Sequence, residues 1–401
     1  MDDLLTGFAP GVLDRDAVVD DTGRSLTYRQ LDSSTNALAL RLRALGVRPG
    51  VFVGICHDRS AAAIVGALAV LRAGGGYVGL DPAQTDACLT AQCEDAGVEV
   101  LLTHASMLHR MPELACRVLD LDAALNSPSA LQRIEPSARL HDVAYVMYTS
   151  YSTGAPRGVR VSRASLRALI DWHNYAFSIT VHDRASVITS PAFDASVWET
   201  WPYLVAGASL HLPDHATTLT SGALRQWMLN QRITIGFVPT PMAEQLLELP
   251  WPADAALRAL LTGGDVLHRR PAPGMPFALV NNYGVTEAAV VSTSGVVSPE
   301  GAGLPSIGRP IAGTTLRVIT PDGHLAEAGM SGELCISGRG VALGYVNRPE
   351  LTAERFVVDP FAVEPGTRMF RTGDCARIGE DGNVEFLGRL DNGQLERSLA
   401  G

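Results

Sequence analysis

The feature that most constrains the fold is an alternation of short apolar runs with helix-like segments through residue 304. One helix-like segment, residues 60–72, is rich in alanine and ends in three glycines, and another begins near Arg163. The apolar runs have the length of strands and lie at residues 51–56, 77–80, 98–103, 144–149, 233–238, 259–261 and 277–280. Strands separated by helices form parallel sheets that are covered on both faces. The sequence therefore predicts an α/β body.

The pattern changes near Pro305. Apolar runs at residues 314–319 and 333–337 flank the turn Pro321-Asp322-Gly323, which is typical of a β-hairpin, and residues 382–387 form a further short strand. We therefore expect an α/β body of two sheet–helix layers at residues 1–304, a smaller β-rich unit at 305–391, and a tail at 392–401.

Composition and charge exclude several classes of protein. The chain has 401 residues, of which 46% are hydrophobic, so it can bury a large core, and its net charge of −10 argues against nucleic acid as a partner. The longest apolar run, near residues 61–71, is too short to span a membrane. The acidic N-terminus lacks a signal-peptide pattern, and the six cysteines form no C-x-x-C pair. These features predict a cytoplasmic protein.

The chain contains no lysine, so all 32 basic residues are arginines. A guanidinium supplies positive charge but differs from an ammonium in shape and in proton chemistry. Any mechanism that needs a lysine ammonium therefore cannot run in this chain alone.

The strongest local pattern is the segment from Tyr148 to Gly158, in which a strand leads into a loop of hydroxyls and glycines with Arg157 near its end. Backbone N–H groups and hydroxyls in such a loop could cradle phosphate oxygens. The spacing G-x-x-x-x-G-K-[ST] of a Walker loop is absent. A surface turn has the same composition, so the segment alone leaves both interpretations open.

Further motifs follow downstream. The segment from Asn281 to Glu287 follows an apolar strand and offers an aromatic ring, a hydroxyl and a carboxylate, which suit an adenine ring, a phosphate oxygen and a divalent metal. It could equally be a capping turn before a helix. Asp374 could accept hydrogen bonds from ribose hydroxyls, and Arg389 could contact phosphate. Their motifs are Gly332-Glu333-Leu334, Arg371-Thr372-Gly373-Asp374 and Gly388-Arg389-Leu390-Asp391, each of which alone could be a surface turn.

Taken together and in this order, the motifs resemble those of the adenylate-forming superfamily. The resemblance runs from Leu26-Thr27-Tyr28 and Leu71-Arg72-Ala73-Gly74 to Gly388-Arg389-Leu390-Asp391. The segment Phe193-Asp194-Ala195-Ser196-Val197-Trp198-Glu199 is similar to the amino-acid-activating branch, the adenylation domains of nonribosomal peptide synthetases. The resemblance implies the large N-terminal core of such a domain, with layered parallel sheets and helices plus a smaller distorted barrel.

The resemblance also implies a reaction in two half-steps. An amino-acid carboxylate attacks the α-phosphate of ATP bound with Mg²⁺, which gives an aminoacyl-AMP and pyrophosphate. The thiol of a peptidyl carrier protein then takes the acyl group, and a condensation domain is a further expected partner. Charge gathers on phosphate oxygens in the transition state, so hydrogen-bond donors and metal are the main catalytic resource.

By resemblance, the nucleotide site has four parts. Tyr283 would stack on adenine, Glu287 would hold Mg²⁺, and Asp374 would bind the ribose. The phosphates would be lined by residues of the hydroxyl-rich loop, namely Thr149, Ser150, Ser152, Thr153, Gly154 and Arg157, together with Thr286. The remaining nucleotide contacts would come from Gly263, Gly264, Asp265, Asn282, Gly284 and Arg389.

The resemblance also places the amino-acid pocket. Asp194 would pair with the α-ammonium of the substrate. The residues that match the family's specificity positions are Asp194, Ala195, Trp198, Gly236, Leu261, Gly263, Asn282, Val290 and Val291. They are similar to a leucine-selecting pattern except that Gly236 stands in place of Phe, so we expect an apolar amino acid the size of leucine or larger. Alternatively, these residues are core positions and the pocket is vestigial.

Several positions depart from the family pattern. Tyr151 stands where the family has a glycine, Arg157 replaces the loop lysine and Val285 replaces a proline. The sequence ends about ten residues after Asp391, the matching hinge position, so the family's small C-terminal subdomain and its catalytic lysine are expected to be absent. A tyrosine is poorly suited to a phosphate loop because the backbone there must approach the anion closely.

Two hypotheses follow from these departures. The first is an amino-acid-activating enzyme core whose adenylation activity is impaired in this chain. The second is a catalytically inactive adenylation domain that serves as a docking platform in the assembly line. A third interpretation, an acyl-CoA ligase or luciferase-like enzyme, is disfavoured because Asp194 would have no ammonium to pair with in a fatty or aryl acid.

Overall fold

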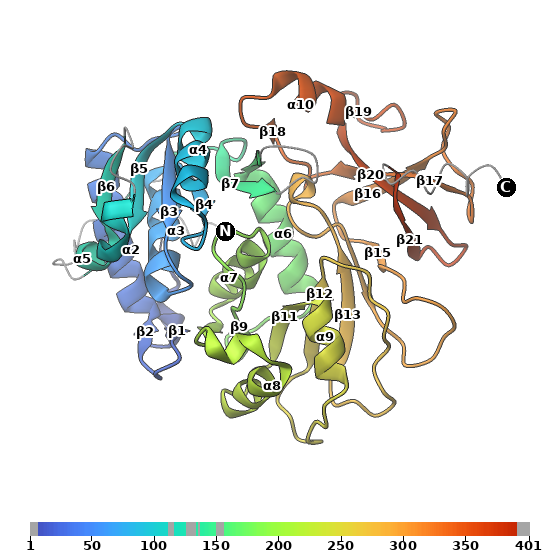
Figure 1. The fold of residues 1–401 in the computed structure, drawn as a ribbon, viewed down its shortest axis with the longest axis horizontal. Coiled ribbons are helices and arrows are strands. Elements are labelled where there is room, and N and C mark those ends of the chain that lie inside the picture. The colour runs from blue at the N-terminus through green and yellow to red at the C-terminus, as the bar shows by residue number, and fades with distance from the viewer. Residues whose placement is uncertain (1–6, 111–115, 126–133, 135–136, 150–155, 391–401) are drawn as a thin grey trace. The chain divides into compact units, whose positions relative to one another are not determined.

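A computed structural model describes residues 7–110, 116–125, 134, 137–149 and 156–390 of the chain (Figure 1). Contacts divide the chain into two compact units. Unit 1 comprises Met1–His215 and Ala342–Arg348, and unit 2 comprises Ala216–Val341 and Pro349–Gly401. The predicted boundary near Pro305 stays a prediction.

Unit 1 contains a mixed seven-stranded sheet with the strand order β18-β8-β7-β4-β3-β5-β6. Five of its strands run parallel to one another, namely β7, β4, β3, β5 and β6. β8 pairs antiparallel with β7, and β18 pairs antiparallel with β8. The strands are β3 (Phe52–Cys56), β4 (Gly76–Leu80), β5 (Val98–Thr103), β6 (Arg117–Asp120), β7 (Val143–Thr149), β8 (Arg157–Ser162) and β18 (Gly344–Tyr345). The strands predicted at residues 51–56, 77–80, 98–103 and 144–149 are thus confirmed.

The remaining strands of unit 1 are β1 (Asp16–Val19), β2 (Ser25–Thr27), β9 (Arg184–Ser186) and β10 (Ser209–His211). β9, β10 and β1 pair in parallel, and β2 pairs antiparallel with β1. The helices of this unit are η1 (Pro10–Val12), α2 (Tyr28–Ala44), α3 (Ala61–Ala73), α4 (Asp86–Ala96), η2 (Ala105–Arg110), α5 (Leu121–Leu125), α6 (Arg163–Ala176) and α7 (Ala195–Ala206).

Helix α3 shows how the sequence sets the local structure. Ser60 caps its N-terminus by accepting a hydrogen bond from the N–H of Ala63, and Gly74 ends it in the left-handed conformation with φ of 105°. Almost all of its residues are buried. Small alanine side chains let the helix pack closely, so this connection between β3 and β4 is buried along almost its whole length.

Unit 2 begins with η3 (Ala216–Leu219) and α8 (Ser221–Asn230), and its first strands are β11 (Ile235–Pro239), β12 (Ala259–Gly263) and β13 (Ala278–Tyr283), with α9 (Thr240–Leu247) between the first two. These three strands pair in parallel. Antiparallel strands β14 (Thr293–Val296) and β15 (Arg309–Pro310) follow, with η4 (Thr286–Ala288) before them.

The second sheet of unit 2 is antiparallel, with the order β16-β17-β20-β19 and β21 paired to β20. Its elements are β16 (Thr314–Ile319), β17 (Ser331–Gly338), α10 (Pro349–Arg355), β19 (Phe356–Val358), β20 (Arg368–Ile378) and β21 (Val384–Arg389). The predicted hairpin around Asp322 is confirmed, since β16 and β17 pair antiparallel. The chain therefore has the predicted α/β fold, with mixed, largely parallel sheets and a curled antiparallel sheet.

One element differs from the prediction. The loop after β7 leads not directly into a helix but into β8, which returns antiparallel to β7 before α6 begins at Arg163. Val159 and Val161 of β8 are fully buried. In the part of the chain that the structure describes, no helix is long and apolar enough to cross a membrane.

Candidate functional site

The predicted phosphate loop is anchored by two paired strands. Thr149 ends β7 and Arg157 begins β8; the two residues are partners in the sheet, and the Thr149 hydroxyl donates a hydrogen bond to the Arg157 carbonyl at 3.4 Å. The predicted residues Ser150, Tyr151, Ser152, Thr153 and Gly154 lie outside the described residues.

In unit 2, a pocket lies where strands β12 and β13 end. Because these strands are parallel neighbours, their carboxyl ends bring the residues that follow them to the same edge of the sheet. The pocket is lined by seven predicted nucleotide residues, namely Gly264, Asp265, Asn282, Tyr283, Gly284, Asp374 and Arg389. Sequence reasoning did not identify Phe386, which also lines it, with its ring centroid 6.2 Å from that of Tyr283.

Asp374 is the centre of the polar network in this pocket. Its side chain is almost fully buried, and it accepts hydrogen bonds from the Tyr283 hydroxyl at 2.5 Å and from Arg389 Nη1 at 2.9 Å. Burial, together with the neighbouring Asp374 carboxylate, raises the pKa of Tyr283 well above its ordinary value. Tyr283 is therefore a neutral phenol that keeps its proton and donates a hydrogen bond to Asp374.

A bulge in β20 directs Asp374 to this position. Leu334 pairs with Asp374 and the next residue, Cys335, pairs with Arg371, so β20 has extra residues at this point, among them Gly373 with φ of 73°. Glu333, which is buried, accepts a hydrogen bond from the Gly373 N–H at 3.2 Å and from Arg371 Nε at 3.0 Å. Two motifs that looked separate in the sequence thus form one network, in which Glu333 and Arg371 fix the backbone next to Asp374.

Asn282 has a buried polar atom that fits a nucleobase. Its Nδ2 donates hydrogen bonds to the carbonyls of Thr262 and Val280, both at 3.0 Å. Its Oδ1 is buried without a hydrogen-bond partner among the described residues. An unpaired buried oxygen is costly, and the exocyclic amino group of adenine is a donor that could satisfy it.

Two glycines of the site are required by close backbone contacts. A Cβ at Gly263 would lie 2.4 Å from the Asn282 carbonyl oxygen, and one at Gly284 would lie 2.0 Å from the Val290 carbonyl oxygen. Val290 itself has φ of 76° and Ala289 has φ of 53°. Non-glycine residues in the left-handed region cost about 1 kcal/mol or more and cluster at functional sites.

Thr286 and Glu287 lie in η4, beside these strained residues, and Glu287 is buried. The described residues include no group of three or more His, Cys, Asp or Glu side chains able to hold a metal ion. Mg²⁺ usually binds through one or two carboxylates together with substrate phosphates. A single carboxylate such as Glu287 therefore fits Mg²⁺ that arrives with a nucleotide.

The predicted substrate residues of unit 1 lie at the start of α7. Asp194 is the N-cap residue and Ala195 the first residue of the helix. Trp198 is buried, and its indole N–H donates a hydrogen bond to His173 Nδ1 at 2.8 Å. Its ring stacks on that of Trp172, with 6.4 Å between centroids.

The predicted substrate residues of unit 2 lie on neighbouring parallel strands and after η4. Gly236 lies on β11 and Leu261 on β12, both buried, and Gly263 and Asn282 are at the ends of β12 and β13. Val291 is buried and Val290 is partly exposed.

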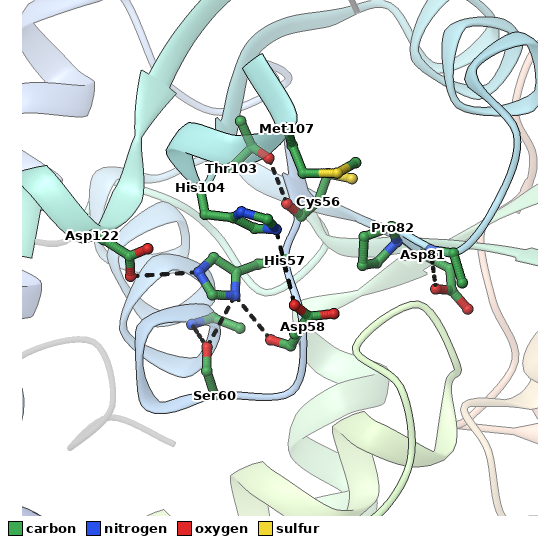
Figure 2. Close-up of polar contacts among 12 residues, drawn as sticks. Cys56, His57, Asp58, Ser60, Asp81, Pro82, Thr103, His104, Met107 and Asp122 are labelled. Atoms are coloured by element: carbon green, nitrogen blue, oxygen red, sulfur yellow. Dashed lines mark hydrogen bonds and ion pairs between the residues drawn. The ribbon is translucent and has the colours of Figure 1, made fainter. Parts of the chain in front are cut away.

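A second polar cluster lies at the carboxyl ends of β3 and β5 in unit 1 (Figure 2). His57 Nε2 is 3.6 Å from Asp122, and His104 Nε2 is 3.9 Å from Asp58. The two rings direct these nitrogens at different carboxylates, so the four side chains do not converge on one ion. His57 Nδ1 also lies 3.1 Å from the hydroxyl of Ser60, the residue that caps α3. The cluster therefore fixes the turn between β3 and α3.

Comparison with known proteins agrees with this fold. Residues 8–346 match the AMP-binding enzyme family. A linear gramicidin synthase protein of Brevibacillus parabrevis is 44% identical over 394 residues, which are 97% of this chain and 5% of that protein. Bacitracin synthase 1 of Bacillus licheniformis is 40% identical over 383 residues, 96% of this chain and 7% of that protein. The chain thus spans only a small part of these relatives.

Solved structures of related proteins have the same fold. The N-terminal subdomain of Klebsiella oxytoca NpsA, in complex with 3-hydroxybenzoyl-AMSN, superimposes with a TM-score of 0.83 at 25% identity, covering 94% of this chain and 97% of that one. The nonribosomal peptide synthetase FmoA3, with bound α-methyl-L-serine-AMP, has a TM-score of 0.86 at 28% identity, covering 96% of this chain and 44% of that one.

The sequence match over residues 8–346 shows that the chain belongs to the AMP-binding enzyme family. Within the family it is the N-terminal core of an adenylation domain of the nonribosomal peptide synthetase type.

Proposed function

We propose that this chain is the core of a cytoplasmic adenylation domain that activates an apolar amino acid, the size of leucine or larger, as its aminoacyl-AMP. The observation that carries the proposal is the pocket of unit 2, in which Tyr283, Asp374 and Arg389 form one hydrogen-bonded network. The unpaired Oδ1 of Asn282 is the second support, since a nucleobase amino group would pair with it.

In this proposal each part of the pocket meets one part of the nucleotide. Tyr283 and Asn282 face the adenine, together with the turn Gly263-Gly264-Asp265, and Asp374 meets the ribose. Thr286 meets the phosphates, and the resemblance alone assigns Thr149 and Arg157 to them as well. Glu287 would hold Mg²⁺, which when bound offsets negative charge on the phosphate oxygens.

The substrate assignment rests on the positions that match the family's specificity residues. Asp194 would pair with the α-ammonium, because an acyclic amino acid at neutral pH carries this charge next to its reacting carboxylate. Gly236 leaves a volume that a phenylalanine would fill, so a leucine-sized or larger apolar side chain is proposed. The product would pass to the thiol of a peptidyl carrier protein beside a condensation domain.

We further propose that adenylation by this chain is slow. Tyr151 occupies a glycine position of the phosphate loop, Arg157 a lysine position, and the chain contains no lysine. Losing one preorganised charge contact to the reacting group costs about a hundredfold or more in rate. The same substitutions favour the second candidate function, a non-catalytic platform that docks carrier or condensation domains.

Calorimetric titration with MgATP and amino-acid-dependent pyrophosphate exchange test these proposals. We expect MgATP to bind and exchange to be slow, with leucine or a larger apolar residue as the best substrate. MgATP binding that appears only in Tyr151→Gly, without exchange in the wild type for any amino acid, would favour the platform. Absence of MgATP binding in both wild type and Tyr151→Gly would contradict the nucleotide site itself.

A further inference from the structure

Glu199 is a buried carboxylate on α7 that holds a backbone segment rather than a ligand. Its side chain is only 2% exposed. One carboxylate oxygen accepts a hydrogen bond from the Ile188 N–H and the other from the Thr189 N–H, both at 3.0 Å, and the Thr189 hydroxyl donates to the second oxygen as well. A buried carboxylate is tolerated only when its lone pairs are filled in this way.

Arg59 binds the same backbone segment from its carbonyl side. Its guanidinium donates to the Ile188 carbonyl and, at 2.8 Å, to the Pro213 carbonyl. Glu199 therefore binds the N–H of Ile188 while Arg59 binds its C=O. Arg59 lies between Asp58 and Ser60 in the sequence, in the turn that the His57 cluster fixes.

The turn that follows Thr189 carries Asp194 and is itself tightly bonded. The Phe193 N–H donates to the Ser190 carbonyl at 2.9 Å, and the Ser196 hydroxyl donates to the Phe193 carbonyl at 2.6 Å. The turn also packs against β4, because a Cβ at Gly79 would lie 2.6 Å from the Pro191 carbonyl oxygen. A shift of the backbone at Thr189 is therefore passed on to Asp194.

We propose that Glu199, with Arg59, is a positioning residue for the amino-acid site. It fixes the backbone of Ile188 and Thr189, and through the following turn it sets where the Asp194 carboxylate lies. This inference rests on the proposed role of Asp194 as the partner of the α-ammonium. The carboxylate is needed because both of its oxygens must accept a backbone N–H, whereas an amide of the same shape has one accepting oxygen.

The test is Glu199→Gln in the full chain, with Glu99→Gln as a matched control on an exposed side chain of the same unit. Calorimetry would measure the Kd of L-leucine, of the larger apolar amino acids and of MgATP. A displaced Asp194 makes a poorer charged hydrogen bond to the α-ammonium, and this loss should weaken amino-acid binding about tenfold. In Glu199→Gln we expect the amino-acid Kd to rise by this factor and the MgATP Kd to stay unchanged. In Glu99→Gln both Kd values should equal those of the wild type.

Hydrogen exchange of the Ile188 and Thr189 amides provides a readout that does not need a bound substrate. Both amides should exchange faster in Glu199→Gln while β3 and β4 keep their protection. Thr189→Val removes only the hydroxyl contact and can be tested in place of Glu199→Gln if that variant does not fold. It should raise the amino-acid Kd and the amide exchange rates in the same direction, but by less. Equal amino-acid affinity and equal exchange in variant and wild type would overturn the inference. Failure of the wild type to bind any amino acid would instead refute the proposed substrate, and the exchange result would still decide whether Glu199 holds the turn.

Discussion

The pH dependence of the unfolding free energy gives a quantitative test of the protonation state of Glu199. Burial raises the pKa of this carboxyl from its ordinary 4.5 to about 7, against the opposing effects of its hydrogen bonds to Thr189 and Ile188 and of the nearby Arg59. Because the pKa is higher in the folded protein than in the unfolded chain, the folded protein binds the proton more tightly. Glu199 therefore contributes stability that is fully present below pH 4.5 and is lost as the pH rises through about 7.

The magnitude follows from the two pKa values. A rise from 4.5 to about 7 corresponds to about 3 kcal/mol over the full titration, of which about 2 kcal/mol falls between pH 5.5 and pH 8. Glutamine has a similar shape and does not titrate in this range. The stability of Glu199→Gln relative to wild type should therefore improve by about 2 kcal/mol when the pH is raised from 5.5 to 8.

Urea denaturation at the two pH values measures this difference. Two of the five tryptophans, Trp198 and Trp201, lie on α7 with Glu199, so tryptophan fluorescence includes a signal from this helix. Glu99→Gln serves as the control for removing a carboxylate at an exposed position of unit 1. A stability difference between Glu199→Gln and wild type that is the same at pH 5.5 and pH 8 would refute the reasoning.

Three further predictions concern the proposed ligands. Asp374→Asn should weaken MgATP binding about tenfold, because the buried partner of two donors is lost, while the exposed control Asp254→Asn should not; equal affinities in calorimetry would rule out this role. Tyr151→Gly should strengthen MgATP binding, since it restores a glycine where the backbone must approach phosphate. An unchanged MgATP Kd would show that Tyr151 does not hinder nucleotide binding. Gly236→Phe should shift preference towards leucine over bulkier apolar amino acids; tightest wild-type binding of a charged amino acid would show the pocket assignment to be wrong.

The local sequence pattern was sufficient to predict the bounds of strands whose ends are marked by polar or turn residues. The strands predicted at residues 98–103 and 314–319 agree with β5 and β16 in both bounds. Strand β8 was missed because its apolar residues are only two valines that alternate with arginine and glycine. Such a segment becomes a strand only because β7 supplies its hydrogen-bond partners, and that pairing is not visible in a single sequence.

The order of the motifs predicted which residues line the pocket of unit 2, but not how those residues contact one another. The hydrogen bond between Tyr283 and Asp374 joins positions 91 apart in sequence, and that between Arg371 and Glu333 joins positions 38 apart. Neither pairing has a local signal, because each depends on strand register and on the bulge in β20. In the sequence Glu199 is likewise only the end of a motif, since its burial and its partners come from the packing of α7.

Glu199 and Glu333 show that the chain uses the same device twice. Each is a buried glutamate that accepts backbone hydrogen bonds near an arginine. Glu199, near Arg59, accepts the N–H groups of Ile188 and Thr189, and Glu333, paired with Arg371, accepts that of Gly373. The segment held by Glu199 leads into Asp194, and Gly373, held by Glu333, directly precedes Asp374. Burying a carboxyl group costs desolvation energy, so the value of these two glutamates lies in fixing geometry rather than in adding stability. We infer that the two aspartates assigned to the substrates are held in place by buried glutamates that do not themselves touch a ligand.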